Sequence, residues 1–386
     1  MNSGGPPVRV FFPCTGLGRE ARGFESFTRA CAAALRGCPE VDITVFGGGG
    51  TLEPGERATW NLPRSGVAAR ALGAVLRRDP YFIEQATFFA GFVRALTTGK
   101  PDLVYFADLN LGNACWHWRR LTGQRFKLLF YNGGATSRPF TRCDVVQQLS
   151  PEHLASALAR GEAPDRQVLL PHGVAMTRNF VPLSAVERER LRAALGVPEG
   201  PPLVLAVGML DRGVKRMDYV IDEVSRMRSR PHLLLLGATT TETAALRSLA
   251  ATRLPGRCTM LTLTHDAARR AYGAADLFVL ASLSEGFGLA QVEALDAGLP
   301  CVTHDTPTSV YVTGPHGRRA DVRRPGALAE ALDATLGSVL ASVSGDGRAR
   351  HDWAWERFSW DRLAGDYVEM FVACATGRRP VFSATS

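Results

Sequence analysis

The strongest constraint on the fold is an alternation of short apolar strands with helical segments, which runs along the chain and restarts near its middle. In the first half, β-rich runs at 8–12 and 41–47 flank the helical pattern at 24–35. The alternation resumes with the strand PLVLAVG at 202–208, after a segment at 181–202 rich in proline and charge. Further strands are expected at 102–107, 127–132, 145–150, 167–171, 232–237, 258–263, 276–282 and 300–304. Strands alternating with helices form parallel sheets, so the sequence predicts an α/β fold with two Rossmann-like domains.

The length of 386 residues exceeds one ordinary hydrophobic core and agrees with two domains. We predict an N-terminal domain over 1–180 and a C-terminal domain over 181–358. Residues 359–378 follow the second βα series and contain apolar residues spaced by three and four. This spacing predicts an amphipathic helix that needs a surface to cover.

Composition excludes several classes of protein. The sequence contains no apolar stretch of about 20 residues, so no membrane-spanning helix is predicted. The first residues lack a signal-peptide pattern, and we therefore expect a cytoplasmic protein. The eight cysteines are scattered without a Cys-x-x-Cys pair, which predicts reduced thiols and neither a zinc nor a redox site. The net charge of +8 suits an anionic ligand. The sequence contains no stripe of basic residues interleaved with aromatic ones, so nucleic-acid binding is not predicted.

The segment 65–98 mixes apolar residues with arginines and ends in an aromatic run. It suits a helix that lines a cleft or contacts a membrane surface, and equally an ordinary surface helix. Peripheral membrane contact is therefore one of the partner hypotheses.

The stretch SEGFGLAQVEALDAGLP, at 284–300, follows a buried strand and begins a helix near Phe287 or Gly288. Ligands of open α/β sheets bind where helices begin, and a helix N-terminus favours anions. Glu285 and Glu293 are about 12 Å apart along such a helix. Two carboxylates at this distance, with an anion site between them, suit a nucleotide sugar. The alternative is a terminal charge at Glu285 and a solvated Glu293.

These residues carry a family resemblance. Glu285-Gly-Phe-Gly-Leu, then Glu293-Ala-Leu, resembles the E-x7-E signature of family 4 glycosyltransferases, retaining enzymes of the GT-B fold that use nucleotide sugars. The segments at 22–35, 169–174, 206–224 and 357–367 are also similar to segments of this family, so the resemblance covers nearly the whole chain.

The resemblance implies a bacterial hexosyltransferase with two Rossmann-like domains that face each other across a cleft. The N-terminal domain would bind the acceptor and the C-terminal domain the nucleotide sugar, while the helix at 359–378 would cross back to the N-terminal domain. Glu285 would contact the transferred sugar, Glu293 the ribose, and Lys215 the diphosphate. Lys215 is one of only three lysines. The donor-binding residues predicted in full are Gly16, Gly18, Gly208, Lys215, Glu285, Gly286, Phe287, Gly288, Leu289 and Glu293.

Two departures from the family pattern concern catalysis. Met209 follows Gly208 where the family has arginine, so we expect Arg212 to supply the guanidinium. Asn132 stands where the family has a histidine, and it can bond a sugar hydroxyl but cannot titrate. Glu285, Lys215, Arg212 and Asn132 are the predicted catalytic residues.

The glycine loop at 14–23 follows the first strand and contains Gly16 and Gly18. The resemblance implies that this loop faces the diphosphate, with charge added by Arg19 and Arg22. The alternative is a plain strand–helix turn, because the full Gly-x-Gly-x-x-Gly fingerprint is absent.

No metal or other cofactor is expected. The chain lacks two aspartates spaced as Asp-x-Asp, and fixed cations with a helix N-terminus can stabilise a leaving diphosphate. The predicted reaction is metal-independent sugar transfer to an acceptor hydroxyl of a natural product or of a cell-surface glycan or lipid precursor. Three alternatives stay open: a nucleotide-sugar epimerase or phosphorylase, a catalytically silent subunit, and a nicotinamide dehydrogenase. The sequence does not determine the oligomeric state.

Overall fold

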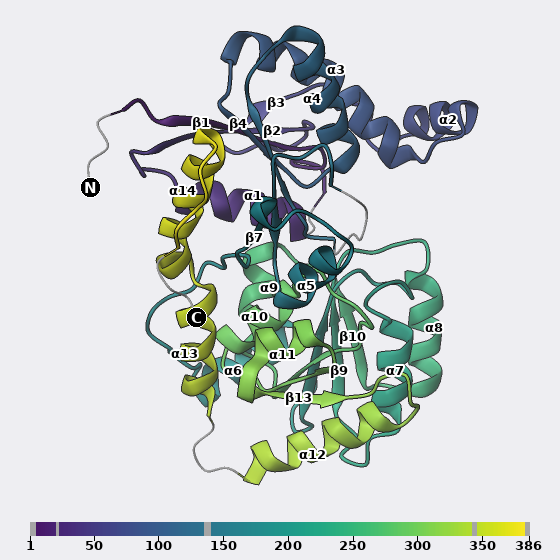
Figure 1. Ribbon diagram of the computed structural model, residues 1–386. Helices are drawn as coiled ribbons and strands as arrows, with labels where there is room; N and C mark the ends of the chain where they lie inside the picture. The colour runs from purple at the N-terminus through teal and green to yellow at the C-terminus, as the bar shows by residue number, and fades with distance from the viewer. Residues whose placement is uncertain (1–4, 21–22, 135–139, 342–345, 383–386) are drawn as a thin grey trace. The chain divides into compact units, whose positions relative to one another are not determined.

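The computed structural model describes residues 5–20, 23–134, 140–341 and 346–382, and the chain divides into two compact units (Figure 1). Unit 1 consists of Met1–Ala175 and Trp360–Ser386, and unit 2 of Met176–Ser359. Within unit 2, the Phe180 ring lies 5.4 Å from that of His351.

Unit 1 is built on a seven-stranded parallel sheet with the order β3-β2-β1-β4-β5-β6-β7. The strands are β1 (Val8–Cys14), β2 (Val41–Gly47), β3 (Arg57–Ala58), β4 (Leu103–Phe106), β5 (Lys127–Tyr131), β6 (Val145–Gln148) and β7 (Gln167–Leu169). The helices are α1 (Gly23–Ala34), α2 (Val67–Leu76), α3 (Pro80–Gly99), α4 (Leu109–Thr122), α5 (Pro151–Ala159), the short 3-10 helix Pro164–Arg166 and α14 (Trp360–Thr376).

Helices cover both faces of this sheet, because successive side chains of its buried strands point to opposite sides. Val10 and Phe12 of β1 pack into one core with α1 and α14. Phe11, the residue between them, packs into a second core with α3 and α4. A strand buried on both faces reads as a continuous apolar run, which is why these strands could be recognised in the sequence.

The C-terminal helix α14 belongs to unit 1, as predicted. Its apolar residues Leu363, Met370 and Phe371 are buried in the core that it shares with β1. The Tyr367 hydroxyl donates to the Pro171 carbonyl at 2.8 Å and accepts from the Gln147 amide at 2.9 Å. The chain therefore returns to its first unit after completing the second.

Unit 2 is built on a six-stranded parallel sheet with the order β10-β9-β8-β11-β12-β13. The strands are β8 (Leu203–Val207), β9 (His232–Leu236), β10 (Cys258–Leu261), β11 (Leu277–Leu280), β12 (Cys301–His304) and β13 (Gly317–Ala320). The helices are α6 (Ala185–Ala194), α7 (Met217–Ser225), α8 (Thr243–Arg253), α9 (His265–Tyr272), α10 (Leu289–Asp296), α11 (Pro307–Thr313), the 3-10 helix Gly314–His316, α12 (Ala327–Ala341) and α13 (Gly347–Phe358).

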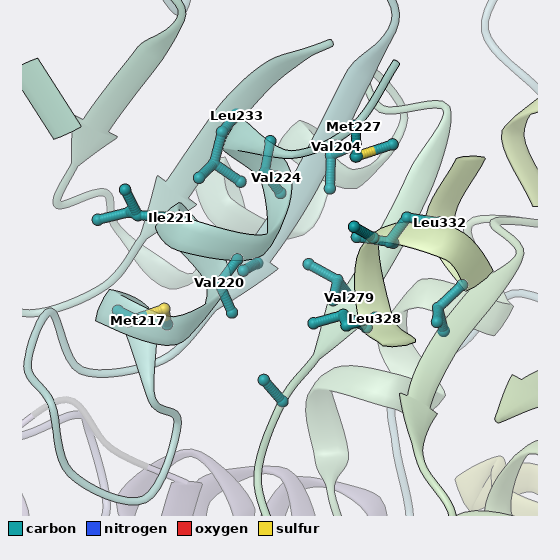
Figure 2. Packing of buried hydrophobic residues seen from close by; sticks show 14 of the residues in the cluster. Val204, Met217, Val220, Ile221, Val224, Met227, Leu233, Val279, Leu328 and Leu332 are labelled. Atoms are coloured by element: carbon teal, nitrogen blue, oxygen red, sulfur yellow. The ribbon is translucent and has the colours of Figure 1, made fainter. Parts of the chain in front are cut away.

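One face of this sheet packs against α7, α8 and α12. Figure 2 shows the contribution of α7 and α12 to this packing. Val220 and Val224 of α7 and Leu328 of α12 meet Val204 and Val279 of the central strands there. The two parallel sheets confirm the predicted α/β class. The edge strands β3 and β13 were not predicted, because RA and GRRA lack the apolar residues that mark a buried strand.

Candidate functional site

The strand order of the unit 2 sheet reverses between β8 and β11, which pair with each other. Loops that follow two such neighbouring strands diverge to opposite faces, and ligands of open α/β sheets bind at this point. Lys215 lies in the loop after β8, and Glu285 in the loop after β11. The topology therefore brings together two predicted residues that are 70 positions apart in the chain.

Lys215 and Glu285 form an ion pair, with 2.5 Å between the ammonium nitrogen and Oε1 of the carboxylate. The side chains are 23% and 11% exposed, so solvent screens the pair only in part. In this state each charge neutralises the other. The pair places one cation and one carboxylate at the switch point of the sheet.

Gly208 and Gly237 make the ion pair sterically feasible. A Cβ on Gly208 would lie 2.5 Å from Cγ of Lys215, so only glycine lets the lysine stem cross the end of β8. A Cβ on Gly237 would lie 1.5 Å from the Gly208 carbonyl oxygen. The predicted donor-binding residue Gly208 thus leaves space for the Lys215 side chain, and Gly237 leaves space for the backbone of Gly208.

Arg212 lies on the same loop as Lys215, but its side chain is exposed. Its backbone amide donates to Glu242 at 2.8 Å, whereas its guanidinium has no hydrogen-bond or ion-pair partner among the described residues. The neighbouring Arg216 is the anchored arginine, which the sequence analysis overlooked. Its guanidinium donates to the Val322 carbonyl at 3.1 Å and lies 4.1 Å from the centre of the Tyr219 ring.

Helix α10 begins at Leu289, just after the predicted start, and Gly288 is its N-cap with φ 87° and ψ 54°. This left-handed conformation favours glycine. Phe287 is buried and packs on Phe358 with ring centroids 5.4 Å apart, which anchors the loop of Glu285 and Gly286 to unit 2. Phe287 thus has a packing role in addition to the donor-binding role predicted for it.

Glu293 lies on α10 and is 16% exposed. Its carboxylate accepts from the Tyr272 hydroxyl at 2.8 Å and lies 3.9 Å from the Arg269 guanidinium. Arg269 also pairs with Asp296 at 2.6 Å. Burial, followed by the nearby Glu293 carboxylate, raises the pKa of Tyr272, so Tyr272 stays a neutral hydrogen-bond donor. These contacts hold Glu293 as an oriented acceptor.

Gln291, in the first turn of α10, was also overlooked by the sequence analysis. Its side chain is fully buried, and neither amide atom has a hydrogen-bond partner among the described residues. The amide nitrogen lies 2.4 Å from where a Cβ on Gly288 would be. The detectable signal is a glutamine among the buried apolar residues Val292 and Leu295.

The glycine loop predicted to face a diphosphate lies in unit 1, after β1. A Cβ on Gly16 would lie 2.3 Å from Oε1 of Glu25, and Gly18 has φ 88° with its Cβ position 2.2 Å from the Gly49 carbonyl. Both glycines are therefore required by close packing within the loop. Arg19 donates to Asn61, and Arg22 lies outside the described residues.

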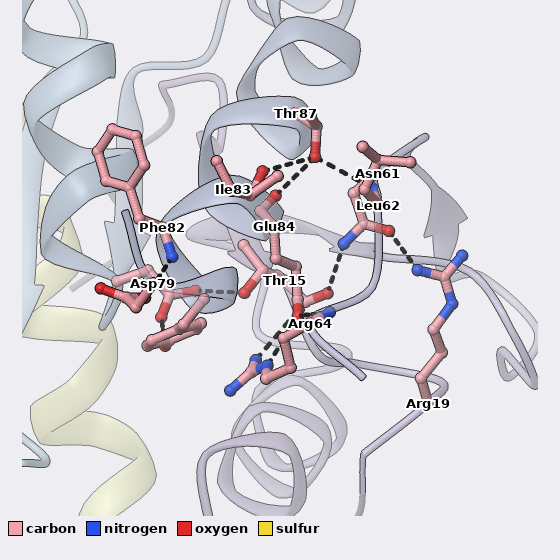
Figure 3. A network of polar contacts seen from close by, with 12 residues as sticks. Thr15, Arg19, Asn61, Leu62, Arg64, Asp79, Phe82, Ile83, Glu84 and Thr87 are labelled. Carbon is pink, nitrogen blue, oxygen red and sulfur yellow. Dashed lines mark hydrogen bonds and ion pairs between the residues drawn. The ribbon is translucent and has the colours of Figure 1, made fainter. Parts of the chain in front are cut away.

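A polar network adjoins this loop (Figure 3). Asp108, just after β4, accepts from the Thr15 hydroxyl at 2.9 Å and from the Tyr81 hydroxyl. Arg64 forms a two-pronged ion pair with Glu84, at 2.7 and 3.1 Å, and its guanidinium lies 4.0 Å from the centre of the Tyr81 ring. Burial raises the pKa of Asp108 from its ordinary value, although both hydroxyl donors lower it. The sequence analysis overlooked this network, whose members come from four separate segments.

Asn132 follows β5 in unit 1 and is buried. Its amide nitrogen donates to the Gln148 side chain at 2.9 Å, and its backbone amide donates to the Gln147 carbonyl at 2.9 Å. Both nitrogens therefore hold neighbouring strands together.

Among the described residues, no group of three or more His, Cys, Asp and Glu side chains is arranged to hold a metal ion. Within the same part of the chain, the helices are too short or too polar to cross a membrane.

Part of the chain matches a known protein family. Residues 201–338, which contain Lys215, Glu285 and Glu293, match the family model described as "Glycosyl transferases group 1". This match lies entirely within the second unit.

The curated relatives of this chain include proteins named as glycosyltransferases. D-inositol 3-phosphate glycosyltransferase from Xylanimonas cellulosilytica is 31% identical over 229 residues, which cover 56% of this chain and 53% of that protein. The GDP-mannose:cellobiosyl-diphosphopolyprenol alpha-mannosyltransferase of Xanthomonas campestris is 32% identical over 100 residues, or 26% of each chain. The chain spans about half the length of the first curated relatives that it matches.

Solved structures resemble the whole chain. Sucrose-phosphate synthase from Thermosynechococcus elongatus has a TM-score of 0.76 at 20% identity, covering 95% of this chain and 100% of that one. Anabaena HepE, solved in complex with UDP and glucose, has a TM-score of 0.72 at 16% identity, again covering 95% and 100%. At these identities the likeness shows the fold, which is the expected GT-B fold.

Proposed function

We propose that this protein is a retaining, metal-independent glycosyltransferase, which moves a sugar from a nucleotide-diphosphate sugar to an acceptor hydroxyl. The observation that carries the proposal is the Lys215–Glu285 ion pair at the switch point of a sheet whose segment 201–338 matches a glycosyltransferase family. An ammonium and a carboxylate are the groups needed by a ligand that has both phosphates and hydroxyls.

In the proposed reaction, donor binding breaks this ion pair. The Lys215 ammonium binds the diphosphate, and Glu285 then accepts hydrogen bonds from hydroxyls of the sugar. The backbone amides at the start of α10, from Phe287 to Leu289, add positive potential where the leaving group gains charge. Lys215 and this helix N-terminus lower the barrier because they stabilise the charge that develops on the leaving diphosphate.

Glu293 would hold the ribose of the donor. Tyr272 and Arg269 already orient its carboxylate, so little side-chain entropy would be lost on binding. A carboxylate with one oxygen engaged by a hydroxyl keeps further lone pairs for a vicinal diol. Arg212, whose guanidinium is exposed on the Lys215 loop, would supply a second cation for the diphosphate.

Sugar transfer with retention would occur on the face from which the diphosphate departs. The acceptor oxygen bonds to the anomeric carbon as the bond to the phosphate oxygen breaks, and that oxygen takes the acceptor proton. The leaving group thus serves as the base, and no covalent sugar–enzyme intermediate is formed. No metal or other cofactor takes part in this scheme.

Unit 1 would bind the acceptor. Asp108, held by Thr15 and Tyr81, is a buried carboxylate next to the glycine loop of Gly16 and Gly18. Because its side-chain nitrogen donates to Gln148 and its backbone amide to the Gln147 carbonyl, Asn132 would support this region. The acceptor class proposed is a natural product or a cell-surface glycan or lipid precursor.

A panel of UDP-, GDP-, ADP- and TDP-sugars in a thermal-shift assay tests donor binding, since a ligand well above its dissociation constant stabilises the protein. Release of nucleoside diphosphate, measured with and without candidate acceptors, then tests transfer. Interconversion of the donor sugar without an acceptor would instead indicate an epimerase. Binding without any turnover would indicate a silent subunit, and a rise in melting temperature with NAD alone would indicate a dehydrogenase.

A further inference from the structure

Two acidic residues of helix α10 lie beside one arginine of α9. Glu293 and Asp296 are three positions apart, so their side chains lie on the same face of α10. The Arg269 guanidinium lies 2.6 Å from the Asp296 carboxylate and 3.9 Å from that of Glu293. Of these two distances only the shorter is that of a hydrogen bond. Arg269 therefore neutralises Asp296 more fully than Glu293, whose other oxygen accepts from Tyr272.

A buried histidine of α13 holds the Asp296 carboxylate. Nδ1 of His351 lies 3.1 Å from Oδ1 of Asp296 and 2.9 Å from the carbonyl oxygen of the same residue. Because both of these oxygens are acceptors, Nδ1 carries the hydrogen and donates it. The His351 side chain is 2% exposed, so water does not compete for this contact. Asp296 is thus held with Oδ1 toward His351 and Oδ2 toward Arg269.

Glycines let α13 approach α10 closely enough for this contact. A Cβ on Gly298, just after α10, would lie 3.1 Å from Cα of Gly347 at the start of α13 and 2.6 Å from the Phe180 ring. The Phe180 ring lies 5.4 Å from the imidazole of His351. This packing fixes His351 beside the C-terminal end of α10.

The two carboxylates of α10 also act on each other. Burial raises the pKa of Asp296, and the nearby negative charge of Glu293 raises it further, whereas Arg269 and His351 lower it. Asp296 and Glu293 therefore compete for one guanidinium. His351 favours Asp296 in this competition, because it orients that carboxylate toward Arg269.

We propose that Asp296 and His351 are positioning residues for the donor nucleotide, because they keep Arg269 from neutralising Glu293. Glu293 then accepts hydrogen bonds from the ribose hydroxyls with its charge available. When Asp296 loses its charge, Arg269 pairs with Glu293 and occupies the lone pairs that the ribose needs. The inference rests on the ribose role proposed for Glu293, and it assigns the selection of ribose over 2′-deoxyribose to these contacts.

Calorimetry with a ribonucleoside diphosphate and its 2′-deoxy counterpart tests this inference. The probe is the tightest-binding of UDP, GDP and ADP, and the quantity measured is the ratio of the two dissociation constants. The wild type should bind the ribose form about tenfold or more tightly, because the deoxy form lacks one hydrogen bond to a charged group. Asp296→Asn should reduce this ratio to about twofold or less, because Arg269 then pairs with Glu293.

A second substitution separates this competition from a loss of structure. Asp296→Asn with Arg269→Gln removes the competing guanidinium together with its partner. The ratio should then return to at least about half of its wild-type value, a non-additive effect that is expected only of residues in one network. A purely structural role for Asp296 predicts that the double variant is no better than the single one.

Two further sets of variants complete the test. His351→Leu leaves Asp296 charged but no longer oriented, and should lower the ratio by a smaller factor, whereas His351→Asn keeps a donor and should retain the ratio. Asp276→Asn is the matched control, because Asp276 is 11% exposed and pairs with Arg188 and Arg192. It precedes β11, at the opposite end of the strands from Glu293, and should leave the ratio unchanged.

The possible failures are distinguishable. A wild type that binds none of the three nucleotides would overturn the proposed function, and with it this inference. Equal binding of the ribose and deoxy forms would overturn the ribose role of Glu293 and the inference that rests on it. If Glu293→Ala loses the discrimination but Asp296→Asn keeps it, only the positioning role is overturned.

The positioning role is also overturned if the double variant is as poor as Asp296→Asn, or if Asp276→Asn lowers the ratio equally. If Asp296→Asn does not fold, His351→Leu and His351→Asn decide the question, and equal ratios in these two variants would overturn the inference.

Discussion

The Lys215–Glu285 ion pair gives a test in which two substitutions at one contact have opposite effects on ligand binding. If the ammonium binds a diphosphate, the pair must break first, so Glu285 competes with the ligand for Lys215. Lys215→Met should then weaken nucleoside-diphosphate binding. Glu285→Gln should leave it unchanged or strengthen it, because the competing carboxylate charge is removed.

The expected magnitudes follow from the geometry of the pair. Loss of charged hydrogen bonds to phosphate costs about 1.5–3 kcal/mol, so Lys215→Met should raise the dissociation constant roughly 10- to 150-fold. Glu285→Gln should lower it by up to about fivefold, equivalent to about 1 kcal/mol for an ion pair that no longer has to be broken. Glu285→Gln should still abolish sugar transfer, because the sugar loses its carboxylate acceptor.

The two substitutions should also differ in how much they lower the free energy of unfolding. Lys215→Met leaves the Glu285 carboxylate, 11% exposed, without its cation. Breaking a fully buried pair costs about 3–5 kcal/mol, and the partial exposure of this pair reduces the expected loss of unfolding free energy to about 1–3 kcal/mol. Glu285→Gln retains an oxygen acceptor for the ammonium and should cost less.

Titration calorimetry with the tightest-binding nucleoside diphosphate, together with urea denaturation, measures both effects. Arg253→Met is the matched control, because Arg253 pairs with Asp222 at 3.0 Å in the same unit, with side chains 56% and 36% exposed. This control should change binding and stability little. If Glu285→Gln weakened diphosphate binding as much as Lys215→Met, competition between carboxylate and phosphate for Lys215 would be refuted.

Four further predictions concern other parts of the chain. Glu293→Ala should weaken nucleoside-diphosphate binding by roughly 1–3 kcal/mol in calorimetry, and an unchanged affinity would refute its ribose role. Transfer should survive EDTA, whereas a complete loss restored by Mg²⁺ or Mn²⁺ would contradict the metal-independent mechanism. Truncation after Ser359 removes α14 from the core of unit 1 and should cause aggregation and loss of activity; a soluble, fully active truncated protein would contradict this. His172 stacks on Phe27 at 3.8 Å, and burial lowers its pKa from 6.5 to about 3, so the native state resists protonation. The free energy of unfolding should therefore fall as the pH drops below 6.5, by about 2 kcal/mol at pH 5. Urea midpoints measure this loss. It should persist in His265→Asn, the control at an exposed histidine, and should be smaller in His172→Asn.

The fold was predictable because buried parallel strands consist of continuous runs of apolar residues. β4 (Leu103–Phe106) and β9 (His232–Leu236) are buried along their whole length, so the sequence alone located them. β13 (Gly317–Ala320) was not predictable in this way, since an edge strand pairs on one side only and needs no apolar run. Its position depends on hydrogen bonds to β12, which a linear pattern does not reveal.

The candidate site was predictable to the extent that it lies within one contiguous motif. Glu285, Gly288 and Glu293 fall within nine residues, and the structure places them on one loop and helix. Contacts between distant segments were not predictable. Tyr272 is 21 residues from the Glu293 that it holds, and the network around Asp108 joins segments up to 93 residues apart.

The ion pair shows what a motif leaves out. The sequence analysis assigned Lys215 and Glu285 to different parts of one ligand and predicted no contact between the two side chains. A partly buried ammonium or carboxylate without a counter-ion is costly, and the two charges pair with each other. A ligand that carries phosphate at one end and hydroxyls at the other can replace both partners at once, whereas a diphosphate alone would leave Glu285 unpaired. Free nucleoside diphosphate should therefore bind less tightly than the intact nucleotide sugar, and Glu285→Gln should reduce that difference.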